Sequence, residues 1–292
     1  MTKKVVLFVL QMLYISLGNA QVYKGVLITE QKGNPVEYAN VGIVGKNIGT
    51  TSNIYGQFEL KIPPEYLRDS IRFSMIGYES ITMLVSDFIN RNNDTIFMEE
   101  KFYAIQEVVI SPTGKNVILG NKNVKVEKGL LTGGYVFGFC KLKKGNEFGI
   151  ILNPNKKKNL LETIILYVTF SYPTLKDCES LNQDTILYRV NLYNIESKND
   201  FENILIQPIY FKSKVNNNQY FYRLEFDISE YNLVIENKTL LSLEYFTDVS
   251  ATMGIASSKK GPASYTRGTS QGYWENTHMS LGVSVKAKII KN

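Results

Sequence analysis

The chain has 292 residues, of which 44% are hydrophobic and 21% are charged, a composition that excludes an intrinsically disordered protein. Its net charge of +6 is too modest to predict a nucleic-acid-binding protein. Aromatic residues are plentiful, with 19 Tyr and 15 Phe, and such side chains favour β-strands. The length predicts one large or two ordinary domains.

Residues 1–20 have the three parts of an export signal: Lys3 and Lys4, an apolar run over residues 5–17, and small residues that end at Ala20. The apolar run is shorter than the about 20 residues that a membrane-spanning helix needs; the alternative is a buried helix. No Cys follows the run, so a lipid anchor is not expected. We expect an exported protein of the periplasm or outer cell surface, with no membrane-spanning segment after cleavage.

Residues 22–100 contain short apolar stretches separated by turn residues. The turns carry Gly and Pro, as in Gly33-Asn34-Pro35 and Pro63-Pro64, which favour sharp changes of chain direction. Short strands with this spacing predict a small β-sandwich. The expected strands span residues 22–28, 36–44, 56–60, 69–75, 81–85 and 95–98.

Five motifs follow one another along residues 33–78: Gly33-Asn34-Pro35-Val36, Ala39-Asn40-Val41, Gly49-Thr50-Thr51, Gly56-Gln57-Phe58 and Phe73-Ser74-Met75-Ile76-Gly77-Tyr78. This order of motifs resembles the carboxypeptidase-regulatory-like domain of Bacteroidetes surface proteins, although family members usually carry Asp where this chain has Asn53. The resemblance implies a seven-stranded sandwich that accompanies a working domain and is not itself catalytic.

The resemblance continues through residues 105–110, a stretch that in TonB-dependent receptors connects this domain to the plug and barrel. Only 182 residues follow residue 110. A 22-stranded transporter needs about 220 residues for its strands alone. We therefore do not expect a transporter.

Residues 101–133 are rich in Lys, Asn and Gly and are predicted to be a linker, with one weak strand at residues 124–126. Residues 134–292 are predicted to be an antiparallel β-sandwich. In residues 185–195 and 220–228, apolar and polar residues alternate, which predicts sheets with one face in water. Arg189 and Asn191 fall on the polar face.

Hydrophobic strand patterns of this second half lie in residues 188–193, 204–209, 224–228 and 243–246. They are similar to the jelly-roll-like modules of Bacteroidetes surface proteins. With strands predicted in both halves, the predicted fold class is all-β. The alternative is a small integral outer-membrane β-barrel with a periplasmic adaptor domain, because strands of such barrels alternate in the same way. We favour the sandwich, since long polar connections fall irregularly and the chain ends without a terminal aromatic residue.

No catalytic, cofactor or metal site is predicted. The chain has one His, whereas a zinc peptidase needs two or three His or Glu ligands at short spacing. Ser270 lies in a Gly-x-Ser-x-Gly pattern, but a nucleophile elbow requires a following helix, which the Gly- and Ser-rich surroundings do not predict. We expect a non-catalytic binding or scaffold protein of the cell envelope, whose partner is an envelope protein or a glycan.

Residues 250–277 lack a clear strand pattern and contain the candidate ligand-binding residues Tyr265, Arg267, Tyr273 and Trp274. Aromatic and Arg side chains often anchor interfaces. The alternative is that Tyr273 and Trp274 belong to the next strand and pack in the core. The chain has two Cys, Cys140 and Cys178, which either form a disulfide outside the cytoplasm or stay apart.

Overall fold

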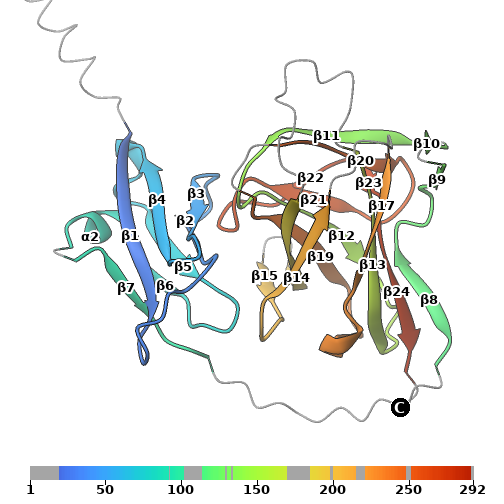
Figure 1. Cartoon of the computed structure of the whole chain (residues 1–292), viewed down its shortest axis with the longest axis horizontal. Coiled ribbons are helices and arrows are strands. Elements are labelled where there is room, and N and C mark those ends of the chain that lie inside the picture. The colour runs from blue at the N-terminus through green and yellow to red at the C-terminus, as the bar shows by residue number, and fades with distance from the viewer. Residues whose placement is uncertain are drawn as a thin grey trace, which may run out of the picture. The chain divides into compact units, whose positions relative to one another are not determined.

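The computed structural model is nearly all β and divides into two compact units, each described here by itself (Figure 1). The first comprises residues 1–101 and 269–273, and the second residues 102–268 and 274–292. The predicted signal lies outside the described residues, apart from Ala20. The structure describes residues 20–91, 93–101, 114–128, 130–132, 134–169, 185–197, 200–214, 221–247 and 251–290. Over these ranges, the structure contains no apolar helix of membrane-spanning length.

The first unit is a β-sandwich of a three-stranded and a four-stranded sheet, with the strand orders β4-β1-β7 and β3-β2-β5-β6. The two sheets contain the seven strands that the resemblance implies. The strands are β1 (Gln21–Thr29), β2 (Asn40–Ile43), β3 (Gly49–Thr51), β4 (Gln57–Ile62), β5 (Ser70–Ser74), β6 (Ile81–Leu84) and β7 (Thr95–Met98).

Aromatic rings fill the core of this sandwich. Residues alternate between exposed and buried along β4, so Phe58 points inward. The Phe73 ring lies 5.8 Å from that of Phe58 and 5.6 Å from that of Phe88, measured between centroids. Phe88 comes from the short helix α2 (Val85–Ile89), which the sequence did not predict. This helix follows β6 directly and places Val85 and Phe88 in the core.

Gly56 occupies a position that a larger residue cannot fill without strain. Its φ is +73°, and an added Cβ would lie 2.2 Å from the carbonyl oxygen of Leu27. The Gly56 carbonyl also accepts a hydrogen bond of 2.8 Å from the Leu27 amide, so the two chain segments cannot separate freely. The turn is further fixed by Asn53, whose Oδ1 accepts from the amides of Tyr55 and Gln57.

We expect Gly56→Ala to destabilise the first unit by more than the about 1–2 kcal/mol that a left-handed conformation costs an ordinary residue. Gly33→Ala is the matched control, because Gly33 has a φ of +65° and a Cβ added there would meet no other atom within 4 Å. Hydrogen exchange of peptides from β1 and β4 measures both losses. Equal losses in the two variants would contradict the role of the close approach to Leu27.

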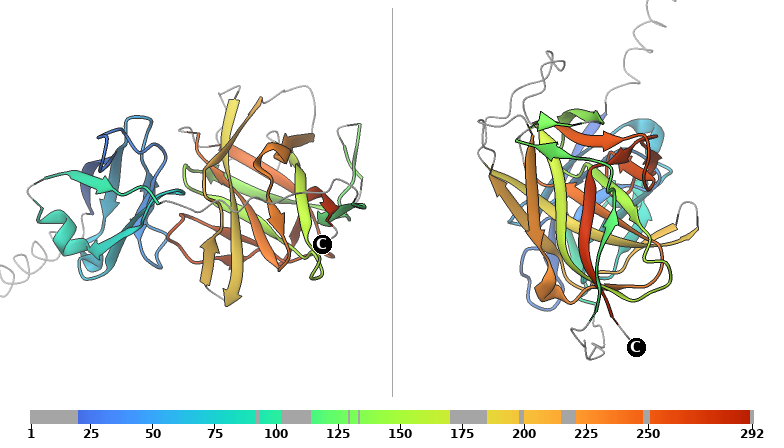
Figure 2. Two further views of the ribbon diagram at one scale, coloured as in Figure 1. Left: turned by 90° about the horizontal axis from the view of Figure 1, so that it is seen from below. Right: turned by 90° about the vertical axis from the view of Figure 1, so that its right-hand side faces the viewer.

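The second unit contains two large antiparallel sheets. The eight-stranded sheet is ordered β11-β20-β13-β24-β8, and Figure 2 shows β24, in dark red, beside the green strand β8. Its strands are β8 (Asn116–Gly120), β11 (Tyr135–Leu142), β13 (Asn159–Thr169), β20 (Ala251–Ser258) and β24 (Val283–Ile289). Three further strands pair with them: β17 (Tyr222–Asp227), β18 (Val234–Ile235) and β23 (Ser280–Leu281).

The seven-stranded sheet is ordered β15-β14-β19-β12-β21-β22, and β16 pairs with β14. Its strands are β12 (Glu147–Leu152), β14 (Thr185–Ser197), β15 (Asp200–Asn203), β16 (Ile209–Lys214), β19 (Thr239–Tyr245), β21 (Ser264–Arg267) and β22 (Glu275–Asn276). The hairpin of β9 (Val126–Glu127) and β10 (Leu130–Leu131) and the short 3₁₀ helices η1 (Pro64–Tyr66) and η2 (Ser229–Tyr231) complete the elements.

The two sheets of the second unit face each other across an apolar core. The Tyr188 ring of β14 lies 6.2 Å from the Phe226 ring of β17, and the Tyr188 hydroxyl donates to the sulfur of Met253 on β20. Phe148 and Leu243 are fully buried in β12 and β19. These contacts make the second unit a sandwich as well.

Two predicted boundaries differ from the structure. The predicted linker, residues 101–133, contains β8, β9 and β10, and β8 is a full strand of the eight-stranded sheet. Residues 250–277, expected to lack strands, contain β20, β21 and β22. The composition of these segments, which are rich in Lys, Gly and Ser, does not predict strands. Pairing of β8 with β24 and of β21 with β12 stabilises them as strands nevertheless.

Candidate functional site

The four candidate binding residues lie in different environments. Tyr265 and Arg267 are on β21, and Trp274 directly precedes β22. The Arg267 guanidinium lies 4.3 Å from the centroid of the Trp274 ring, so the structure brings these two together. Tyr273 is 64% exposed and is grouped with the first unit. The possible disulfide lies outside the described residues, since neither Cys140 nor Cys178 has a described side chain.

Arg267 is the end of a row of charges that crosses the seven-stranded sheet. Arg189 on β14 is opposite Glu244 on β19, Glu244 is opposite Glu147 on β12, and Glu147 is opposite Arg267. Side chains directly opposite one another share a face of the sheet, so the four form a single row. We call Arg189, Glu244, Glu147 and Arg267 the charge row.

Hydrogen bonds connect the charge row to its neighbours. Glu147 Oε2 accepts from Arg267 Nε at 2.6 Å, and Glu147 Oε1 accepts from Asn191 Nδ2 at 2.9 Å and the Tyr193 hydroxyl at 3.0 Å. The Ser242 hydroxyl also donates to Glu147. Burial raises the pKa of the Tyr193 hydroxyl, which keeps it protonated and able to donate.

The second carboxylate is paired with the other arginine. Glu244 Oε2 accepts from Arg189 Nη2 at 2.7 Å and from Nε at 3.2 Å, and the Phe246 ring lies against the guanidinium. Burial raises the pKa of the Glu244 carboxyl, and Arg189 opposes this shift. Both side chains are at most 1% exposed. The alternation of residues 185–195 had placed Arg189 in water; that prediction is wrong, because this polar face of the sheet is buried.

Such an arrangement is suited to holding strands in register. Each arginine pairs with one glutamate at hydrogen-bonding distance, and Asn191 Nδ2 donates to both of the neighbouring glutamates in the middle of the row. The row joins β14, β19, β12 and β21. The Arg267 side chain is 8% exposed and engaged with Glu147, so it forms part of this framework. The sequence offered one signal for the row: charged residues inside strands that are otherwise apolar.

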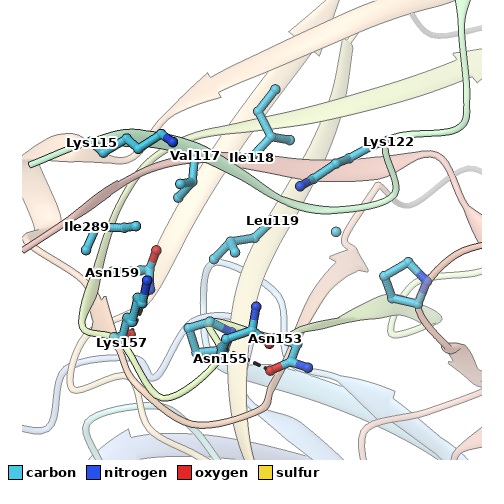
Figure 3. A pocket seen from close by; sticks show the side chains of 13 residues that line it. Lys115, Val117, Ile118, Leu119, Lys122, Asn153, Asn155, Lys157, Asn159 and Ile289 are labelled. Atoms are coloured by element: carbon cyan, nitrogen blue, oxygen red, sulfur yellow. Dashed lines mark hydrogen bonds between the residues drawn. The ribbon is translucent and has the colours of Figure 1, made fainter.

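A cavity of about 390 Å³ lies elsewhere in the second unit, between β8 and the turn that joins β12 to β13 (Figure 3). Val117 and Leu119 point from β8 toward this turn, and Lys115 and Lys122 stand at the two ends of the strand. No Asp, Glu or aromatic residue is among the described lining residues. They are Lys115, Val117, Ile118, Leu119, Gly120, Lys122, Asn153, Pro154, Asn155, Lys157, Asn159, Pro262 and Ile289.

Backbone and side-chain hydrogen bonds fix the turn side of this cavity. Asn155 and Lys156 have φ values of 55° and 57°, and the Lys157 amide donates to the Pro154 carbonyl at 3.2 Å. This combination is a type I′ turn. Asn159 is 1% exposed and its Nδ2 donates to the Lys157 carbonyl at 2.7 Å. The turn that presents Asn153, Asn155 and Lys157 is therefore held in one conformation.

The described residues contain no group of three or more His, Cys, Asp or Glu side chains positioned to hold a metal ion. The cavity could not be predicted from the sequence, because its Lys and Asn residues come from separate polar segments. The unusual density of Lys and Asn in residues 115–122 and 153–159 was the available signal.

Comparison with known families concerns the first unit. Residues 23–110 match the family model of the CarboxypepD_reg-like domain. The chain contains a carboxypeptidase-regulatory-like domain. No curated protein matches the chain.

The regulatory-like domain has the features that the sequence motifs implied. Phe73, from the motif before Gly77-Tyr78, lies at the centre of the core, and Gly56 forms the close turn against Leu27. Asn53 caps the turn through Oδ1 without a charge. A domain of this type is non-catalytic.

Proposed function

We propose that this chain is an exported, non-catalytic binding protein of the cell envelope. The regulatory-like domain acts as a rigid adaptor, and the second unit recognises the ligand. The apolar run of residues 5–17, with small residues ending at Ala20, supports export.

The observation that carries the binding role is the cavity beside β8. Its volume of about 390 Å³ is within the range of about 300–1,000 Å³ that is usual for ligand pockets. Apolar side chains such as Leu119 and Pro154 form part of its lining, and polar groups such as Asn153 and Lys157 add hydrogen-bonding capacity. Hydrogen bonds already fix the turn that forms one side of the cavity, so ligand binding does not have to order that backbone.

The mature protein, which begins at Gln21, should bind saturably to cell envelopes isolated from the producing cells. Cleavage after Ala20 removes two Lys and no acid, and so lowers the net charge from +6 to +4. The control is therefore an unrelated folded protein of charge +4, compared in a sedimentation assay at about 0.15 M salt, where surface charges are well screened. Binding that does not saturate, or that the control matches, would contradict the proposal. An N-terminus other than Gln21 in the exported protein would contradict the predicted cleavage.

A further inference from the structure

We infer that the cavity beside β8 binds an acidic polysaccharide. This inference rests on the proposed binding function and adds the chemical class of the ligand. The geometry that points to it is a groove with ammonium groups at its two ends and on its opposite side, and with carboxamides between them (Figure 3).

The charge of the groove selects an anion. Lys115, Lys122 and Lys157 line it, and all three are exposed. Within the described residues, none of their ammonium groups forms an ion pair with a carboxylate. Like charges on facing walls repel, and a bound anion relieves that repulsion.

The spacing of the lysines selects an extended ligand. Lys115 and Lys122 flank β8, whose five residues Asn116–Gly120 extend over about 13 Å between the first and last Cα atoms at about 3.3 Å per residue. A single phosphate or carboxylate would have to draw both lysine side chains over the strand to contact both ammonium groups. A chain with repeated negative groups can contact Lys115, Lys122 and Lys157 together.

The remaining lining favours sugars over nucleic acid. Asn153 and Asn155 are exposed, and a carboxamide both donates and accepts hydrogen bonds, which suits hydroxyl groups. Proteins that bind single-stranded nucleic acid stack its bases on aromatic rings. The described lining of this groove contains no aromatic residue, so it offers no such platform. A polymer of sugars that bear carboxylates or sulfates fits both the charge and the hydroxyl-binding groups.

The test compares four probes by calorimetry with the full mature protein: polygalacturonate, heparin, neutral dextran and oligo(dT). The two acidic polysaccharides should bind, and their relative affinities distinguish a carboxylate from a sulfate ligand. A triple variant should weaken the binding of the acidic polysaccharides by about tenfold or more, as expected for the loss of three charge contacts. It combines Lys115→Gln, Lys122→Gln and Lys157→Gln. The control combines Lys128→Gln, Lys212→Gln and Lys214→Gln, which remove the same charge from exposed positions outside the groove.

Several results would overturn the inference. If the two triple variants weaken polysaccharide binding equally, the cavity beside β8 is not the binding site. If dextran binds as tightly as polygalacturonate, the ligand need not be an anion. If oligo(dT) binds more tightly than both acidic polysaccharides, the ligand is a nucleic acid and not a polysaccharide. If neither acidic polysaccharide binds while the mature protein still binds envelopes saturably, the ligand class is wrong and the proposed binding function stands.

Discussion

Arg189→Ala should destabilise the second unit by about 3–5 kcal/mol, because it leaves the buried Glu244 carboxylate without its partner. Arg223→Ala is the matched control. Arg223 also pairs with a glutamate in this unit, at 2.5 Å from Glu225, but its side chain is 46% exposed. An exposed pair of this kind contributes at most about 1 kcal/mol.

Urea unfolding measures the two losses. The chain has one Trp, and Trp274 lies against Arg267 at the end of the charge row, so its fluorescence reports the unfolding of this region. The double variant Arg189→Met with Glu244→Leu should recover part of the loss, since it removes the uncompensated charge as well. If Arg189→Ala lowers the free energy of unfolding no more than Arg223→Ala does, the buried pair stabilises the unit no more than an exposed pair.

Phe73→Ala should destabilise the regulatory-like domain by about 3–5 kcal/mol, because truncation of a fully buried aromatic ring leaves a cavity in the core. The cavity would border Phe58 and Phe88, whose centroids lie 5.8 and 5.6 Å from that of Phe73. Packing of both sheets and of α2 depends on this ring.

Phe97→Ala is the control in the same domain, since Phe97 is 49% exposed on β7. Its loss should stay within about 0.5 kcal/mol, as is usual for surface substitutions. Hydrogen exchange of peptides from β5 reports the opening free energy in both variants. Similar protection of β5 in Phe73→Ala and in the unmodified protein would refute the central role of Phe73.

Local patterns were sufficient to predict six of the seven strands of the first unit and several long strands of the second. The alternation in residues 185–195 corresponds to β14, and residues 95–98 form β7 as expected. Strand periodicity depends on neighbours two residues apart, so it is present in the sequence itself. The alternation also predicted correctly that Tyr188 and Val190 are buried, although Arg189 on the opposite face is buried as well.

The charge row and the cavity beside β8 are each formed by residues that are far apart in the sequence. Alternation identifies Arg189 as polar, but nothing near residue 189 indicates that Glu244 will cover it. Lys115 and Lys157 similarly meet in one groove only because β8 and the β12–β13 turn border the same space. Strand order and register decide such contacts, and these are properties of the whole sheet.

The charge row also has a consequence for the kinetics of folding. Glu147 and Arg267 are separated by 120 residues, and Arg189 and Glu244 by 55. Contacts between such distant residues make folding slow, because long loops must close before the pairing is gained. Interactions that form after the folding transition state act mainly on the unfolding rate. We expect the row to form after the folding transition state, so that its loss would mainly raise the unfolding rate of the sheet.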